Sequence, residues 1–220
     1  MNKVISAKEA VKLIKDGCTI MISGFAGVKK PEVLIDLMVK NNIKNLTVIA
    51  NDAAIPGKGI GRLISHRCVK KLIASHIGLN PEAGRQMNAG ELEVELIPQG
   101  TLAERIRCAG AGLGGFFTPT GIGTSVEEGK QKFIVEGKEY LLELPLKADV
   151  AIIKGSVVDT LGNVFYKGTT QNFSLVMAMA ADLVIVEAEK IVKPGELKPE
   201  HVMTPSVFVD YIVGAECNGN

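Results

Sequence analysis

The stretch from Asp16 to Pro31 restricts the fold more than any other part of this chain. Its residues Ile20 to Ser23 leave no room for a solvent-facing side, so they predict a buried strand at the centre of a parallel sheet. Gly24 and Gly27 follow, and glycines let the backbone turn tightly and approach a ligand closely. Pro31 suits the first position of the next helix, where its missing N–H costs nothing. A loop between such a strand and such a helix is where open α/β sheets bind anions.

Apolar runs and amphipathic segments alternate along the rest of the chain. Further buried strands are predicted at residues 46–50, 149–153 and 183–186, and additional strands at residues 72–75, 92–97 and 207–213. Helices are predicted after a capping box at residues 6–9, at 31–42 and 81–90, after a second capping box at 101–104, and at 173–181. Glu136-Gly137 predicts a short hairpin between residues 133–135 and 139–144. This order indicates an α/β fold with an open, mostly parallel twisted sheet, helices on both faces and a small hairpin excursion.

No linker or internal repeat divides the sequence, so we expect one domain over residues 1–216 and a polar tail over residues 217–220. Twenty-five basic and 24 acidic side chains give a net charge of +1, which argues against a nucleic-acid partner. No stretch approaches the roughly 20 apolar residues of a membrane span, and the charged N-terminus does not resemble a signal peptide. Four widely spaced cysteines indicate reduced thiols and a cytoplasmic location. The three histidines lack metal-ligand spacing, so no metal site is expected.

Polar residues follow the first four predicted strands, at the edge where α/β sheets bind ligands. These tips comprise residues 24–30, 51–52, 75–76 and 98–100. Asn51 and Gln99 are neutral amides, which can donate to a developing oxyanion without adding a charge. Either residue could instead be a turn or cap residue. Gln99 is the stronger candidate because it lies between Pro98 and Gly100, just before a helix.

The stretch at residues 16–31 also resembles the signature of the family I (3-oxoacid) coenzyme A transferases. The matching residues are Asp16, Gly17, Ile20, Met21, Ile22, Gly24, Phe25 and Pro31. Ser23 and Lys29 stand where that signature has glycines. The likeness continues through residues 98–107, 112–115, 118–124, 161–163 and 172–173, so it covers essentially the whole chain. Within the family it is greatest to alpha subunits of bacterial acetate and butyrate–acetoacetate CoA-transferases.

This resemblance implies an enzyme that moves coenzyme A between a short-chain acyl-CoA and a carboxylate such as acetate, butyrate or acetoacetate. Coenzyme A and acyl-CoA are then substrates, and no cofactor is bound permanently. The resemblance implies that Asn51 and Gln99 face the substrate. It also implies a loop that binds coenzyme A, made of Gly24, Phe25, Ala26, Gly27, Val28, Lys29 and Lys30. The two lysines are interpreted either as solvated loop residues or as contacts to the phosphates of coenzyme A.

The family's nucleophile is a glutamate, which in two-chain members lies in a Ser-Glu-Asn-Gly segment of the beta subunit. This chain has no such segment, so we expect no catalytic nucleophile in it. Its other candidate glutamates are interpreted as surface, capping or turn residues: Glu32, Glu82, Glu104, Glu127, Glu128 and Glu143. The expected partner is a beta subunit, in an assembly of two alpha and two beta chains. A non-catalytic ligand-binding module of the same fold is the alternative: the missing nucleophile favours it, and the likeness at both site loops favours the enzyme.

The run from Ala109 to Thr124 contains six glycines, and we expect it to be irregular. Residues 110–115 fit the pattern G-x-G-x-x-G, but they follow a helix rather than opening a strand–turn–helix unit, so no dinucleotide site is predicted. Phe116 and Phe117 would form an exposed apolar patch on a single chain. We therefore predict that at least one of these two rings packs against another chain.

Overall fold

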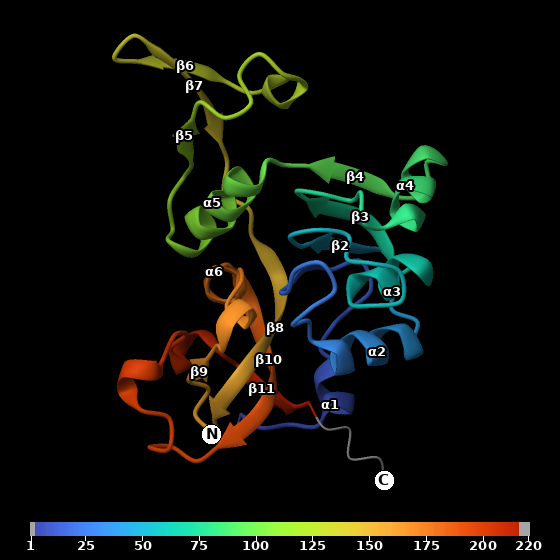
Figure 1. Ribbon diagram of the computed structural model, residues 1–220, viewed down its shortest axis with the longest axis vertical. Helices are drawn as coiled ribbons and strands as arrows, with labels where there is room; N and C mark the ends of the chain where they lie inside the picture. The colour runs from blue at the N-terminus through green and yellow to red at the C-terminus, as the bar shows by residue number, and fades with distance from the viewer. Residues whose placement is uncertain (1–2, 216–220) are drawn as a thin grey trace.

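The computed structural model describes residues 3–215. An eight-stranded sheet forms its centre, and the strands along the main path of this sheet are parallel (Figure 1). Its strands are β1 Thr19–Ile22, β2 Leu46–Ile49, β3 Val69–Ala74, β4 Glu93–Leu96, β8 Ala148–Asp159, β9 Val164–Phe165, β10 Ala181–Val192 and β11 Tyr211–Gly214. Along the sheet the order is β11-β10-β8-β1-β2-β3-β4, and these neighbours are parallel. The short β9 pairs with β8 in the antiparallel sense. The predicted polar tail at residues 217–220 and Cys217 lie outside the described residues.

Helices cover both faces of this sheet, as predicted (Figure 1). They are α1 Ala7–Val11, α2 Glu32–Lys40, α3 Ile60–Ser65, α4 Pro81–Asn88, α5 Gln99–Gly110 and α6 Ser174–Met179. Short 3-10 turns occur at Ser125–Glu127, Gly168–Thr170, Pro199–His201 and Ser206–Phe208. Ile20 and Ile22 of β1 belong to the core under α1 to α4, whereas Met21 belongs to the core with α5 and α6. All three side chains are fully buried, so the prediction of a central strand with no exposed face is confirmed.

The chain reverses its direction of travel across the sheet at β1. From β1 it proceeds outward through β2, β3 and β4, and it then returns to place β8 on the other side of β1. The carboxyl ends beside such a switch point are where open α/β sheets bind ligands. Between residues 3 and 215, no helix has the length and apolar character needed to cross a membrane.

A small antiparallel sheet projects from one end of the main sheet (Figure 1). It consists of β5 Phe116–Thr118, β6 Lys132–Val135 and β7 Lys138–Glu143, in the order β5-β7-β6. Glu136 and Gly137 have φ angles of 50° and 76°, which suit a two-residue hairpin turn and confirm that prediction. The expectation of an irregular run at residues 109–124 is wrong for β5. Pairing with the distant β7 makes these residues regular despite the glycines around them.

Two predicted helix starts are shifted in the structure. Helix α5 begins at Gln99 rather than after a cap at Thr101, because Pro98 occupies the cap position directly after β4. Thr101 is therefore a buried residue inside the first turn. Pro31 was predicted at the first position of α2, but it is the cap residue before this helix, and Glu32 occupies the first helical position. In contrast, the capping box that opens α1 is present at Ser6 and Glu9.

A buried ion pair connects the longest strands of the sheet. Lys154 of β8 and Glu187 of β10 lie 3.0 Å apart between Nζ and Oε1, and Glu187 is fully buried. Oε2 of Glu187 also accepts the backbone N–H of Leu34, in the first turn of α2, at 3.0 Å. Burial raises the pKa of Glu187, and the Lys154 ammonium opposes that rise. The Glu187 carboxylate thus connects β8 and β10 with the first turn of α2.

Replacing Glu187 with Gln should lower the free energy of unfolding by about 3 kcal/mol, because Lys154 would be left buried without its counter-charge. Urea titration of the purified chain measures the change. Glu189→Gln is the matched control on the same strand, since Glu189 is exposed and its ion pair among residues 3–215 is with the exposed Lys29. We expect the control to cost less than about 1 kcal/mol. Equal losses for the two variants would contradict a supporting role for the buried pair.

Candidate functional site

Four side chains meet at the carboxyl edge of the main sheet and are called here the amide cluster: Asn51, Ser75, Gln99 and Asn172. Asn51 follows β2, Ser75 follows β3, and Gln99 begins α5 after β4. Asn172 comes from the turn before α6, far away in sequence. Because the strands are parallel, their tips lie at one edge, and the two predicted amides are therefore brought into direct contact.

Asn51 is the centre of the cluster. It is only 1% exposed, and its Nδ2 donates to the carbonyl oxygen of Gly24 at 3.0 Å and to Oδ1 of Asn172. Its Oδ1 accepts a hydrogen bond from Nε2 of Gln99 at 2.5 Å. A backbone carbonyl can only accept, so the contact with Gly24 fixes which end of the Asn51 amide is nitrogen. Both N–H groups of this side chain are therefore already used.

Gln99 supplies the free donor of the cluster. One N–H of its Nε2 donates to Oδ1 of Asn51, and no described residue accepts a hydrogen bond from the second N–H. Its Oε1 shares the single hydrogen of the Ser75 hydroxyl with the backbone carbonyl oxygen of Asn51, which lies 2.7 Å from Oγ. Both ends of the Gln99 amide are thus held while one N–H stays available on an exposed side chain. Such a fixed neutral donor suits a developing oxyanion.

The first turn of α5 adds to this polarity. The leading N–H groups of a helix have no intrahelical acceptor, and Pro98 supplies no side-chain cap for them. They carry the partial positive charge of a helix N-terminus, beside the free N–H of Gln99. The two effects together favour negative charge at this point of the sheet edge.

The loop predicted to bind coenzyme A leaves β1 next to the cluster. Phe25 and Val28 exchange two backbone hydrogen bonds, and the N–H of Ala26 donates to Oδ2 of Asp52 at 2.8 Å. The side chains of Phe25 and Val28 are about half exposed, at 51% and 54%. Lys29 is also partly exposed and forms an ion pair of 3.0 Å with Glu189. The loop therefore has a fixed backbone and outward-facing side chains.

Lys30 differs from the other residues of this loop. Its side chain is buried, with Nζ 3.9 Å from Oδ1 of Asp52. The interpretation of Lys30 as a solvated loop residue is therefore wrong, because the side chain is buried. Burial lowers the pKa of Lys30, and the carboxylate of Asp52 opposes that change.

Sequence analysis missed two members of the cluster. Ser75 was placed at a strand tip but given no role, and Asn172 was noted only as part of a family pattern. Asn172 has a φ of 39°, a left-handed conformation that asparagine tolerates better than most residues. An asparagine directly before a predicted helix was the available signal. Nothing in its sequence position shows that it reaches β2.

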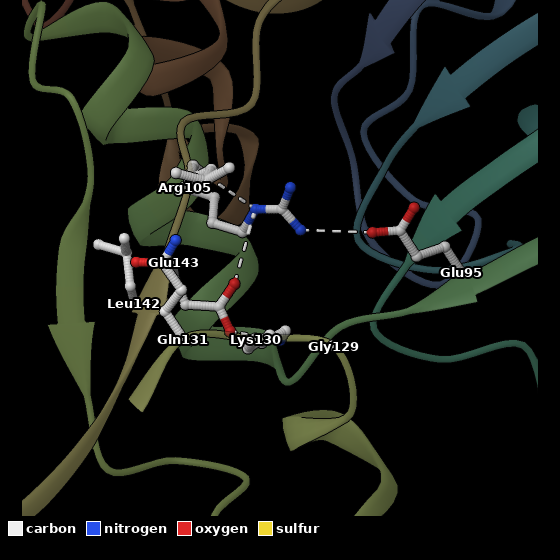
Figure 2. A pocket seen from close by; sticks show the side chains of 8 residues that line it. Glu95, Arg105, Gly129, Lys130, Gln131, Leu142 and Glu143 are labelled. Atoms are coloured by element: carbon white, nitrogen blue, oxygen red, sulfur yellow. Dashed lines mark hydrogen bonds and ion pairs between the residues drawn. The ribbon is translucent and has the colours of Figure 1, made fainter. Parts of the chain in front are cut away.

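Glu143 corrects another expectation, because it is buried rather than a surface or turn residue. Figure 2 shows it in a hollow of about 310 Å³ between the small sheet and β4. Lys130 contacts one carboxylate oxygen at 2.5 Å, and Nε of Arg105 lies 3.9 Å from the other. Arg105 also reaches Glu95 at 3.3 Å and the carbonyl oxygen of Leu144 at 2.8 Å. These ion pairs brace α5 against the small sheet and leave Glu143 unsuited to act as a nucleophile.

Across residues 3–215, no group of three or more His, Cys, Asp or Glu side chains is placed to hold a metal ion. The three described cysteines, Cys18, Cys68 and Cys108, are free thiols. The chemistry that the described residues offer is therefore hydrogen bonding by neutral amides and backbone groups at the sheet edge.

Comparison with known proteins identifies the family. A family model described as coenzyme A transferase matches residues 4–215. The chain belongs to the coenzyme A transferase family. It is 58% identical over 212 residues to the acetoacetyl-CoA:acetate/butyrate CoA transferase alpha subunit of Clostridium acetobutylicum, covering 96% of this chain and 97% of that one. It is 50% identical over 212 residues to the acetate CoA-transferase subunit alpha of Escherichia coli K12, covering 96% of each.

Solved structures confirm the fold of this coenzyme A transferase chain. An acyl-CoA transferase of Escherichia coli O157:H7, YdiF, crystallised as a thioester complex with CoA, superposes with a TM-score of 0.85 at 25% identity. The match covers 100% of this chain but 48% of YdiF. The chain thus spans about half the length of that structural relative.

Gln99→Ala should lower kcat for CoA transfer in the assembled enzyme by roughly ten- to a thousandfold, because it removes the free N–H of the amide cluster. KM for acyl-CoA should change little. Asn88→Ala is the matched control, since Asn88 is an exposed amide at the end of α4, outside both the cluster and the small sheet. Sedimentation velocity shows whether assembly is intact. Dissociated subunits in the Gln99 variant would instead identify Gln99 as a structural residue.

Proposed function

We propose that this chain is the alpha subunit of a short-chain acyl-CoA:carboxylate CoA-transferase acting on acetate, butyrate or acetoacetate. The observation that carries the proposal is the free N–H of Gln99, held between Asn51 and Ser75 at the switch-point edge of the sheet. The names of the relatives from Clostridium acetobutylicum and Escherichia coli support the substrate class and the role as a subunit. The resemblance to family I supports a nucleophilic glutamate on a beta subunit.

In the proposed reaction, the partner's glutamate attacks the carbonyl carbon of acyl-CoA, and the thiolate of coenzyme A leaves. This forms an acyl-glutamyl anhydride. The thiolate then attacks the glutamyl carbonyl carbon, releases the acyl group as a carboxylate and leaves a glutamyl thioester. A second carboxylate reverses the sequence and departs as the new acyl-CoA. Each attack places negative charge on a carbonyl oxygen, which the Gln99 N–H stabilises in this proposal.

Asn51 and Gln99 have different roles in this proposal. Both N–H groups of Asn51 are already bound, to Gly24 and to Asn172, so Asn51 orients Gln99 rather than contacting the oxyanion itself. This assignment refines the expectation that both amides face the substrate. Hydrogen bonds that are fixed before the reaction need no reorganisation as charge develops.

The loop at residues 24–30 is proposed to bind coenzyme A. Its fixed backbone lies beside the amide cluster, and Phe25 and Val28 offer apolar surface for the pantetheine arm. Lys29 is exposed enough to reach a phosphate after leaving Glu189. Coenzyme A and acyl-CoA are thus substrates in this proposal, with no cofactor bound permanently.

The small sheet is proposed to meet the beta subunit in an α2β2 assembly in the cytoplasm. Phe117 is 48% exposed and packs its ring against Phe133 of β6, with the centroids 4.9 Å apart. The neighbouring Ile134 is 78% exposed. Phe116 is half-buried and lines a hollow of about 270 Å³ with Gly100, beside Gln99. A partner that covers Phe116 would lie next to the free donor, where a glutamate from another chain is needed.

A non-catalytic ligand-binding module of the same fold is the second candidate. Glu143 is buried and paired with Lys130, so this carboxylate cannot supply the missing nucleophile. This observation favours the binding module. The two candidates differ in one measurable property, which is turnover in the presence of the beta chain.

The purified chain alone should not transfer coenzyme A between acetoacetate and a short-chain acyl-CoA, because it lacks the proposed glutamate. Coexpression with the beta chain should give ping-pong kinetics. The assay follows the appearance of acetoacetyl-CoA by its absorbance. Turnover by the single chain at an enzymatic rate would contradict the division of the site between two chains, and a coexpressed pair without turnover would favour the binding module.

Addition of the beta chain should slow amide hydrogen exchange in residues 109–124 and 132–135, because the partner would cover the apolar residues of the small sheet. Exchange measured by mass spectrometry with and without the beta chain tests this. Residues 206–208 serve as the internal control, since Val207 is also highly exposed, at 80%, but lies outside the small sheet. Equal protection of residues 109–124 in both samples would rule out the interface.

A further inference from the structure

Lys30 presents an unusual combination of charge and burial. The residue is 2% exposed, and its Nζ has no hydrogen-bond partner among the described residues. The nearest carboxylate oxygen, Oδ1 of Asp52, is 3.9 Å away. A buried ammonium without hydrogen bonds is costly, so its presence calls for a compensating role.

The aliphatic part of Lys30 fills the space between two glycines. A Cβ atom at Gly24 would lie 2.3 Å from Cγ of Lys30, and one at Gly59 would lie 2.1 Å from Cδ. Both distances are shorter than any ordinary contact between carbon atoms. The side chain of Lys30 therefore spaces the loop after β1 from the turn before α3, and it does so only because both neighbours lack a side chain.

The charged end of Lys30 faces the carboxylate that holds the loop. Oδ2 of Asp52 accepts the N–H of Ala26 at 2.8 Å, and Oδ1 accepts the N–H of Ala54 at 2.6 Å. Nζ of Lys30 lies 3.9 Å from Oδ1, the oxygen that accepts the N–H of Ala54. Ala26 has a φ of 47°, which is unfavourable for alanine, so its conformation depends on this hydrogen bond.

The same loop is connected to the amide cluster. Gly24, which contacts the stem of Lys30, offers its carbonyl oxygen to Nδ2 of Asn51 at 3.0 Å. Asn51 in turn holds Gln99. A continuous set of contacts thus joins Lys30 to both the proposed coenzyme A loop and the free donor.

We propose that Lys30 is a positioning residue, which acts through Asp52 and Gly24 to hold the loop at residues 24–29 in the conformation that binds coenzyme A. This inference rests on the proposed function for the role of the loop, and on the described contacts for its geometry. In this proposal Lys30 does not touch the substrate, whereas the exposed Lys29 can do so after leaving Glu189.

Lys30→Met tests the proposal because it keeps the stem between the two glycines and removes the charge. In the assembled enzyme, KM for acyl-CoA should rise about tenfold, with kcat within about twofold of the parent. Amide exchange of residues 25–29 should become at least tenfold faster. Asp52→Asn should give the same pattern, since it weakens the other half of the contact. Lys29→Met is the control, because it removes the same charge from the same loop at an exposed position; residues 25–29 should then exchange as in the parent.

The double variant Lys30→Met with Asp52→Asn decides whether the two residues act together. We expect its KM to be no higher than that of the worse single variant, since residues in one network are not additive. It also buries no charge, so it provides the comparison if a single variant does not fold. A hundredfold rise in the double variant, or parental loop exchange and parental KM in Lys30→Met, would overturn the proposal. If the parent enzyme lacks transferase activity, the proposed function fails, and the exchange measurement still decides the role of Lys30.

Discussion

The side chain of Asn51 sets the main constraint on this molecule. It is 1% exposed at the edge of the sheet, and leaving a buried amide group without partners costs roughly 1–3 kcal/mol. The native structure therefore has to bring the carbonyl of Gly24, the amide of Gln99 and the side chain of Asn172 to this point. These partners come from the loop after β1, the start of α5 and the turn before α6. One buried polar group thus couples the folding of three separate segments to the shape of the site.

The same hydrogen bonds explain why the site is organised before any substrate arrives. Gln99 is exposed, yet both ends of its amide are held, so its free N–H points in a fixed direction. An exposed glutamine normally loses side-chain conformational freedom when it binds a ligand. Here Asn51 and Ser75 have already restricted that freedom during folding. A donor prepared in this way is effective only if the reacting group is delivered to it, and the proposed glutamate nucleophile belongs to another chain.

Sequence analysis predicted the features that depend on local patterns. The buried run at residues 20–22 led to the central parallel strand, Glu136-Gly137 led to the hairpin, and the carboxyl-end rule placed Asn51 and Gln99 at one edge. Two of the errors share a physical cause, which is contact between segments distant in sequence. Strand β5 forms because β7 pairs with it, and Glu143 is buried because Arg105 and Lys130 converge on it. The start of α5 was misplaced for a local reason: a capping pattern at Thr101 was preferred to the proline that precedes Gln99.

The adjacent lysines of the loop show where pattern-based inference ends. Lys29 and Lys30 are neighbours with the same charge, and no periodicity distinguishes them; yet one pairs with an exposed glutamate and the other is enclosed by Gly24 and Gly59. The enclosure depends on Gly59, which lies on the far side of α2 and β2 in the sequence. A methionine would fill the same space without the cost of desolvating an ammonium. Nζ of Lys30 lies 3.9 Å from Oδ1 of Asp52, the carboxylate that accepts the N–H of Ala26 in the loop. The choice of lysine at this position follows from what the loop must do, because packing alone does not require it.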